Sequence, residues 1–165
     1  MNPDNPDDPI NPQLSCTRAA TRPGSPVGQI SRMSPTSPAG PRGRILVVED
    51  DPDAALFLVH VLANRGQFEV THTADPAVAL RLAAAEHWDL VLTDMDLPGM
   101  TGLELLGALR QVAPALPVAV VTAHVWGGTT AALLNHADEY LEKPLRADQL
   151  IATVTGLIGQ GRAER

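Results

Sequence analysis

DLVLTDMDLPGMTGLELL, residues 89–106, is the stretch that decides the fold of this chain. It begins with a short apolar run that ends in the carboxylate of Asp94, and it passes through a proline-glycine loop into the segment 101–112. Such an apolar run predicts a buried strand, and Thr101 followed by Glu104 has the spacing of a capping box that starts a helix. The stretch therefore predicts a strand, a loop and a helix, the repeating unit of a parallel sheet.

The same alternation extends in both directions from this stretch. Apolar or alternating runs predict four further strands, at residues 44–50, 68–73, 117–122 and 139–144. Helical patterns predict four further helices, at residues 51–66, 75–87, 129–137 and 146–158. Two of these helices begin with Asp-Pro, in which the aspartate can cap the helix and the proline suits its first turn. In the first of them Leu56, Val59 and Leu62 recur at helical spacing.

Five strands that alternate with five helices predict an α/β fold of the (βα)5 type. We expect a doubly wound, parallel, five-stranded sheet with helices on both faces and the flavodoxin-like strand order 2-1-3-4-5. Ligands of such open sheets bind beyond the carboxyl ends of the strands. Those ends are therefore the place to look for chemistry.

The first 43 residues differ in composition from the rest of the chain. Nine of the 15 prolines lie between Pro3 and Pro41, and the segment has almost no apolar periodicity. We interpret residues 1–43 as a disordered, proline-rich extension, residues 44–160 as one folded domain, and residues 161–165 as a short tail. Two alternatives stay open for the extension: a functional tether, or a mis-assigned start with Met33 as the initiator.

The composition excludes several classes of protein. No run approaches the roughly 18 apolar residues of a membrane span, and the acidic, proline-rich N-terminus lacks the features of a secretory signal, so we expect a cytoplasmic location. The single cysteine, Cys16, excludes an internal disulfide framework. The formal net charge of −7 argues against direct nucleic-acid binding.

Carboxylates gather at the carboxyl ends of the predicted strands. Glu49 and Asp50 end the first strand, and Asp94, followed by Asp96, ends the third. Packed like charges raise one another's pKa, so such a cluster suggests a neutralising cation. Oxygen ligands with open positions suit Mg2+, which often shares its coordination sphere with phosphate.

Lys143 follows the fifth strand and is the only lysine in the chain, because the other eleven basic residues are arginines. Its ammonium group can pair with a phosphoryl group as a point charge. Pro144, which follows it, is a candidate for a cis peptide bond that aims the lysine.

Four motifs in this order, ILVVEDDP, DLVLTDMDLPGMTGLELL, VVTAH and DEYLEKPL, resemble the signatures of bacterial response-regulator receiver domains. This is the two-component signalling family of the chemotaxis response regulator, and the resemblance covers about residues 44–160. It implies a phosphoacceptor, a Mg2+ site, a hydroxyl and a lysine that contact the phosphoryl group, and an aromatic switch. By this resemblance the phosphoacceptor is Asp94, and the Mg2+ ligands are Glu49, Asp50 and Asp94 with the backbone carbonyl of Asp96. The hydroxyl and the lysine that contact the phosphoryl group are those of Thr122 and Lys143. The aromatic switch is Tyr140, which switches together with Thr122.

The resemblance also implies the partners and the kind of activity. We expect a stand-alone receiver that takes a phosphoryl group from a sensor histidine kinase or a histidine phosphotransfer protein and then changes its binding to a downstream target. Such a domain is a phosphoprotein of a phosphorelay rather than an enzyme, although it catalyses its own phosphorylation and dephosphorylation. A homodimer through the fourth helix, fifth strand and fifth helix would also fit the family.

Two other interpretations stay open. One is a pseudo-receiver, a binding module with this fold that works without phosphorylation. The other is a haloacid-dehalogenase-like phosphatase, because DMDLPG resembles the Asp-x-Asp motif of those enzymes. That family places its acidic pair after the lysine, whereas only Asp148 and Glu164 follow Lys143 here.

Overall fold

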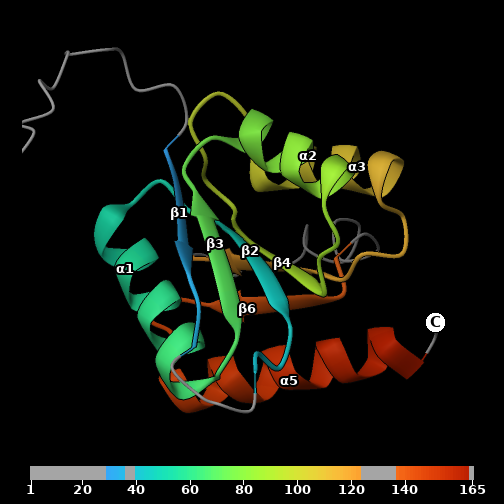
Figure 1. The fold of residues 1–165 in the computed structure, drawn as a ribbon. Coiled ribbons are helices and arrows are strands. Elements are labelled where there is room, and N and C mark those ends of the chain that lie inside the picture. The colour runs from blue at the N-terminus through green and yellow to red at the C-terminus, as the bar shows by residue number, and fades with distance from the viewer. Residues whose placement is uncertain (1–28, 36–39, 124–136, 164–165) are drawn as a thin grey trace, which may run out of the picture.

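A six-stranded sheet lies at the centre of the computed structural model, which describes residues 29–35, 40–123 and 137–163 (Figure 1). The strands are β1 (Ile30–Met33), β2 (Arg44–Val48), β3 (Glu69–Thr73), β4 (Leu90–Asp94), β5 (Val118–Thr122) and β6 (Glu139–Glu142). The helices are α1 (Pro52–His60), its π-helical continuation η1 (Val61–Arg65), α2 (Pro76–Ala85), α3 (Gly102–Val112) and α5 (Ala147–Ala163). Residues 129–136 of the predicted fourth helix lie outside the described residues.

The order of the strands is β1-β3-β2-β4-β5-β6. From β3 to β6 all neighbours are parallel, so the predicted order 2-1-3-4-5 is confirmed for the five expected strands. The register pairs Asp94 with Val121 and Thr122 with Glu142. The carboxyl ends of β4, β5 and β6 therefore reach the same edge of the sheet.

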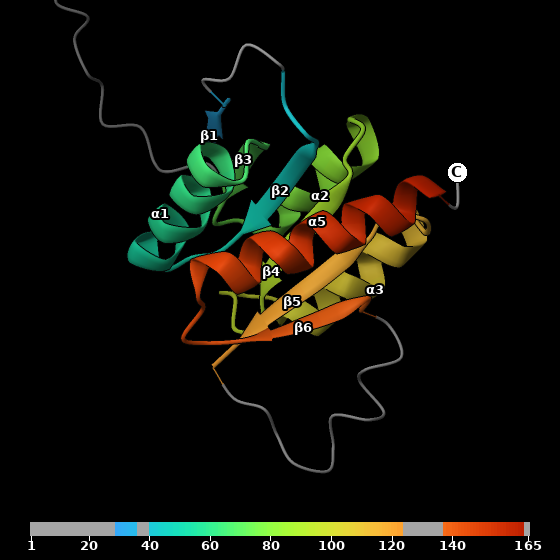
Figure 2. The same ribbon diagram turned by 90° about the horizontal axis from the view of Figure 1, so that it is seen from below.

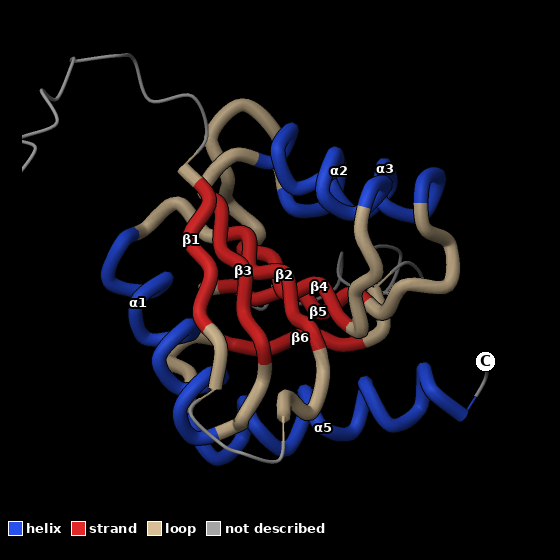
Figure 3. Tube along the Cα trace, in the orientation of Figure 1, coloured by secondary structure: helices blue, strands red, loops and turns tan. Residues whose placement is uncertain are grey.

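Helices cover both faces of the sheet, with α1 and α5 on one face and α2 and α3 on the other (Figures 2 and 3). Alternate residues of β2 divide between the two faces: Ile45 and Val47 join the core under α1 and α5, whereas Leu46 and Val48 join the core under α2 and α3. Both faces of the sheet are buried under helices, which explains why the central strands are continuous apolar runs.

The predicted starts of α1, α2 and α3 are confirmed. Asp51 accepts a hydrogen bond from the backbone N–H of Ala54 at 2.8 Å, and Asp75 accepts one from Ala77 at 2.8 Å. Thr101 and Glu104 form the reciprocal capping box. Leu56, in contrast, does not serve the core, because it is 68% exposed on the outer side of α1.

The sheet has one strand more than the five expected, because residues 30–33 of the predicted disordered extension form β1. Residues Ile30–Met33 pair antiparallel with β3, from Ile30 opposite Thr73 to Met33 opposite Val70. All four are exposed, so the strand docks through backbone hydrogen bonds at the edge of β3, and Arg32 adds an ion pair with Glu86 at 2.6 Å. Translation from Met33 would remove three of its four residues.

The tail predicted at residues 161–165 is also shorter than expected, because α5 continues to Ala163. Arg162 explains the extension. Its guanidinium donates to the carbonyl of Arg42 at 2.8 Å and lies 3.5 Å from a carboxylate oxygen of Asp89. These contacts hold the last turn of α5 against the start of the sheet.

Candidate functional site

Three carboxylates meet where β2 and β4 end. Glu49 and Asp50 follow β2, and Asp94 is the last residue of the neighbouring β4. One carboxylate oxygen from each of the three lies within 4.8 Å of those of the other two. Glu49 is 1% exposed and Asp94 is 8% exposed, whereas Asp50 faces solvent. The cluster is thus buried on one side and open on the other.

Lys143 enters this cluster from the end of β6. Its Nζ atom lies 2.9 Å from Oδ2 of Asp94 and 3.0 Å from Oε2 of Glu49. Its backbone N–H donates to the carbonyl of Thr122 at 2.8 Å, and its peptide bond to Pro144 is cis. Burial alone would lower the pKa of Lys143, but the hydrogen bonds and charges of Asp94 and Glu49 outweigh burial and raise it.

Glu49 carries the strongest perturbation in the cluster. Burial, together with the charge and hydrogen bonding of Asp94, raises its pKa to about 7, against the opposing pull of Lys143. A carboxyl group with this pKa exchanges its proton near neutral pH. A cation that enters the cluster therefore displaces a proton as it binds.

The two carboxylate oxygens of Asp94 have different partners. Oδ2 accepts from Lys143, and Oδ1 accepts from the backbone N–H of Met95 at 2.7 Å. The carbonyl of Met95 in turn accepts from Gly102, the first residue of α3, at 2.7 Å. The side chain of Asp94 is therefore held in one orientation by the loop that follows it.

The remaining residues predicted from the sequence lie on β5, on β6 and in the loop after β4. Thr122 is buried at the end of β5, one residue past the partner of Asp94 in the register. Tyr140 is half-buried on β6, and burial raises its pKa. Asp96 is exposed in the loop after β4, and its carboxylate is outside the three-residue cluster.

The donor set fits a small divalent cation. Mg2+ binds oxygen at about 2.0–2.1 Å, so two ligand oxygens on one ion lie at most about 4.2 Å apart. The three oxygens here lie within 4.8 Å of one another, and small side-chain movements would bring them to that spacing. Asp50 faces solvent, which leaves room for the waters that Mg2+ retains.

His72 on β3 contacts the backbone of Glu49 and was not singled out from the sequence. Its Nε2 atom lies 2.8 Å from the backbone carbonyl oxygen of Glu49. The signal that could have found it is its position in the second strand, one residue before the carboxyl end.

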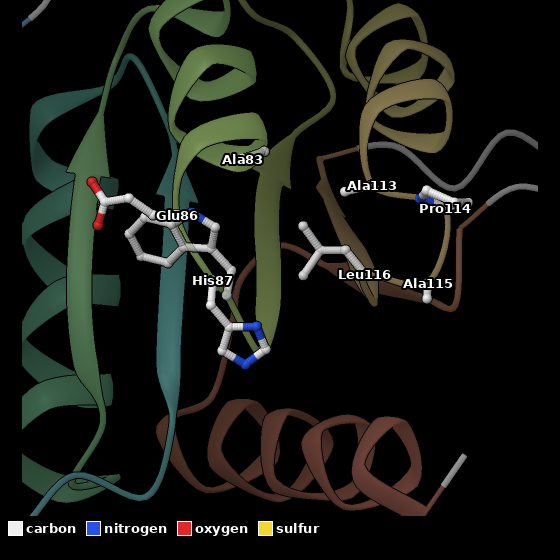
Figure 4. Close-up of a pocket in the computed structure, with 8 residues that line it drawn as sticks. Ala83, Glu86, His87, Ala113, Pro114, Ala115 and Leu116 are labelled. Atoms are coloured by element: carbon white, nitrogen blue, oxygen red, sulfur yellow. The ribbon is translucent and has the colours of Figure 1, made fainter. Parts of the chain in front are cut away.

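The hollow shown in Figure 4 lies at the opposite end of the sheet. It has a volume of about 210 Å3 and is formed by residues 83 and 86–88, from the end of α2 to the start of β4, and by residues 113–116, between α3 and β5. Its lining is mostly apolar and has one carboxylate, that of Glu86. It therefore lacks the charges that gather at the carboxyl ends of the strands.

The geometry defines a class of protein: a flavodoxin-like α/β domain with an acidic cluster and a lysine at the carboxyl ends of its strands. The chain matches the response regulator receiver domain family over residues 45–155, and it belongs to that family. It is therefore a receiver domain of two-component signalling, whose members are generally phosphorylated and use Mg2+. The match to this family excludes the interpretation as a haloacid-dehalogenase-like phosphatase.

Curated relatives agree with this family. The chain is 34% identical over 151 residues to the transcriptional regulatory protein TcrA of Mycobacterium tuberculosis, which covers 90% of this chain and 54% of TcrA. It is 36% identical over 114 residues to the DNA-binding transcriptional regulator NtrC of Escherichia coli, which covers 68% of this chain and 24% of NtrC. The chain thus spans about half, or less, of the length of these relatives.

Solved structures agree as well. A CheY-like receiver domain protein from Methanospirillum hungatei has a TM-score of 0.69 and 28% identity, over 74% of this chain and 98% of that one. The receiver domain of the sensor histidine kinase PA1611 from Pseudomonas aeruginosa, solved with a magnesium ion in its active-site cleft, has a TM-score of 0.64 and 28% identity, over 71% of this chain and 98% of that one. Among the described residues, no helix is long and apolar enough to cross a membrane.

Proposed function

We propose that Asp94 accepts a phosphoryl group from a phosphohistidine protein, in a Mg2+-dependent reaction, and that the modified domain signals by altered binding to a downstream protein. The observation that carries this proposal is the contact of Lys143 with both Asp94 and Glu49. The ammonium group of Lys143 contacts both the proposed acceptor, Asp94, and a proposed metal ligand, Glu49. Phosphoryl transfer depends mainly on such positioning and charge neutralisation.

Each residue of the site has its own role in the proposed phosphoryl transfer. A carboxylate oxygen of Asp94 attacks phosphorus, and the P–O bond forms as the P–N bond to the donor breaks; the electron pair of that bond stays with the imidazole nitrogen. Lys143 neutralises a phosphoryl oxygen, and the Thr122 hydroxyl donates to another. Mg2+ held by Glu49, Asp50, Asp94 and the carbonyl of Asp96 would supply further positive charge. Water later cleaves the P–O bond, which releases phosphate and restores the carboxylate.

Thr122 and Tyr140 would transmit the phosphorylation of Asp94 to the surface around β6. Thr122 adjoins the acceptor strand, and Tyr140 is half-buried one strand further on. A Thr122 hydroxyl drawn toward the phosphoryl group leaves space beside β6, and the ring of Tyr140 can move into it. This is a local change of charge that biases a two-state element.

This chain offers a donor protein a docking surface beside Lys143. A groove of about 250 Å3 is lined by Ala54, Phe57 and Leu58 of α1 and by residues 143–145. Phe57 is 38% exposed, and its neighbour Leu56 is 68% exposed. An exposed apolar surface at the mouth of a site marks a contact for another protein. We therefore place the docked donor against α1, with its phosphohistidine directed toward Asp94.

The deciding experiment is the intact mass of the protein after incubation with phosphoramidate and Mg2+. Wild type is expected to gain one phosphoryl group, Asp94→Asn none, and wild type with chelator none. Asp53→Asn, which removes an exposed acid from the first turn of α1, is the matched control and should be modified like wild type. An unmodified wild type that still binds Mg2+ would favour the pseudo-receiver interpretation.

A further inference from the structure

The backbone between β2 and α1 carries two of the proposed metal ligands on one short turn. The last ladder bond of β2 is donated by Glu49 N–H to the carbonyl of Thr73, at 3.3 Å. The helix cap follows at Asp51, which accepts from Ala54 at 2.8 Å. Between these fixed points lies the peptide unit that joins Glu49 to Asp50.

His72 holds that peptide unit. Its Nε2 atom lies 2.8 Å from the Glu49 carbonyl oxygen, and because a carbonyl can only accept, Nε2 must carry a proton. The Glu49 carbonyl and the Asp50 nitrogen belong to one rigid plane. A hydrogen bond at the carbonyl therefore fixes the direction in which Asp50 leaves the turn.

Asp50 needs such support more than its neighbours do. Glu49 is held by Lys143 at 3.0 Å, and Asp94 is held by Lys143 and Met95. Asp50 is exposed, and within residues 29–35, 40–123 and 137–163 its carboxylate accepts no hydrogen bond. The backbone therefore sets the direction of its Cα–Cβ bond, and no other described contact guides the side chain.

We propose that His72 is a positioning residue for the metal site, which orients Asp50 through the Glu49–Asp50 peptide so that a divalent cation binds tightly. This inference rests on the Mg2+ site of the proposed function, and not on phosphoryl transfer. Residues outside the direct ligands that fix ligand orientation typically contribute tenfold or more to metal affinity. The strand that carries His72 is itself braced, because Ser31 of β1 lies opposite His72 in the register.

The test is a calorimetric titration of Mg2+ into the full chain, without any phosphodonor. His72→Leu removes the donor and is expected to raise the Kd about tenfold, whereas His72→Gln, which keeps an N–H donor on a side chain of similar reach, should restore most of the affinity. His60→Leu is the matched control, because His60 is an exposed histidine on α1 that contacts Asn64; it should bind Mg2+ like wild type.

Two further measurements separate positioning from simple stability. Thermal melting of the metal-free proteins should show His72→Leu fully folded at the titration temperature, so that a weaker Kd is not a loss of folded protein. Nitrogen NMR of the imidazole should show a proton on Nε2; an imidazole protonated on Nδ1 alone would overturn the proposal, as would equal Mg2+ affinity of wild type and His72→Leu. If wild type binds Mg2+ but takes no phosphoryl group, the proposed function fails while the role of His72 stands.

Discussion

Lys143 Nζ lies 2.9 Å from Asp94 Oδ2, although 49 residues separate the two in the chain. The parallel sheet makes this contact, because β4 and β6 both flank β5 and end at the same edge. The same ammonium group lies 3.0 Å from Glu49. One ammonium group therefore pairs with both buried carboxyl groups.

Replacing Lys143 by methionine keeps most of the length of the side chain and removes its charge. We expect phosphorylation by phosphoramidate to slow by about 100-fold, the typical cost of removing one charge-stabilising donor. Lys143→Arg should retain part of the rate, because it keeps the charge but carries it on a planar group. The rate is measured by intact mass over time. A Lys143→Met protein that reacts as fast as wild type would contradict the assigned role of Lys143.

Glu49 should make the metal-free protein less stable as the pH rises. Its pKa is raised to about 7 in the folded state and is about 4.5 in the unfolded chain. Between these values the unfolded chain releases a proton that the folded state keeps, so the free energy of unfolding falls with rising pH. The contribution is fully present below about pH 4.5 and is lost above about pH 7.

Urea unfolding of the chelated protein from pH 5 to pH 8 measures this slope. Glu49→Gln should flatten it, whereas Glu142→Gln, which removes an exposed carboxyl group at the end of β6, should leave it unchanged. Saturating Mg2+ should also flatten the slope, because it binds the carboxylate form, and Mg2+ affinity should rise through pH 7. Parallel slopes for wild type and Glu49→Gln would show that Glu49 is not the group responsible.

The sequence predicted the sheet and the helix starts because their signals are local. Asp51, Asp75 and Thr101 act on backbone groups two or three residues away, and a strand buried on both faces must be apolar throughout. The convergence of Glu49, Asp94 and Lys143 followed from these elements, since parallel strands bring their carboxyl ends together.

What the sequence did not predict depends on distant partners. Ile30–Met33 becomes a strand only because the edge of β3, about 40 residues later, offers unpaired backbone groups. The contact of His72 with Glu49 depends on the register of two strands. Leu56 fits the helical spacing but faces solvent, because periodicity alone does not show which apolar residues a helix turns outward.

Arg44 should contribute more to stability than Arg32, although both pair with Glu86. The guanidinium of Arg44 also donates to the carbonyl of His87 at 2.7 Å and lies 4.6 Å from the centre of the Trp88 ring. The side chain of Arg32 is 47% exposed, and its pair with Glu86 ties down β1. Arg44→Ala should therefore cost about 2 kcal/mol of unfolding free energy, and Arg32→Ala at most about 1 kcal/mol. Urea unfolding at one pH compares them; equal costs would mean that the ring and carbonyl contacts of Arg44 contribute nothing.

Gly102 should tolerate no side chain, because it begins α3 directly against the backbone of Asp94. A Cβ atom there would overlap the carbonyl oxygen of Asp94 and lie 2.9 Å from the Cα atom of Met95. Both are backbone atoms, which cannot turn aside as a side chain would, so α3 or the end of β4 must shift. We expect Gly102→Ala to cost about 1–3 kcal/mol and to slow phosphorylation, because the N–H of Met95 that orients Asp94 lies in the displaced segment.

Replacing Gly107, in the same helix, by alanine is expected to have the opposite effect on stability. A Cβ atom there meets nothing within 4 Å, and alanine in a helix interior is favoured over glycine by about 0.5–1 kcal/mol. Gly107→Ala should therefore raise the free energy of unfolding in urea and leave phosphorylation by phosphoramidate unchanged. If both alanine variants reacted at the wild-type rate, the contact between α3 and Asp94 would not control the acceptor. If only Gly102→Ala reacted slowly, the close approach of α3 would be what holds Asp94 in place.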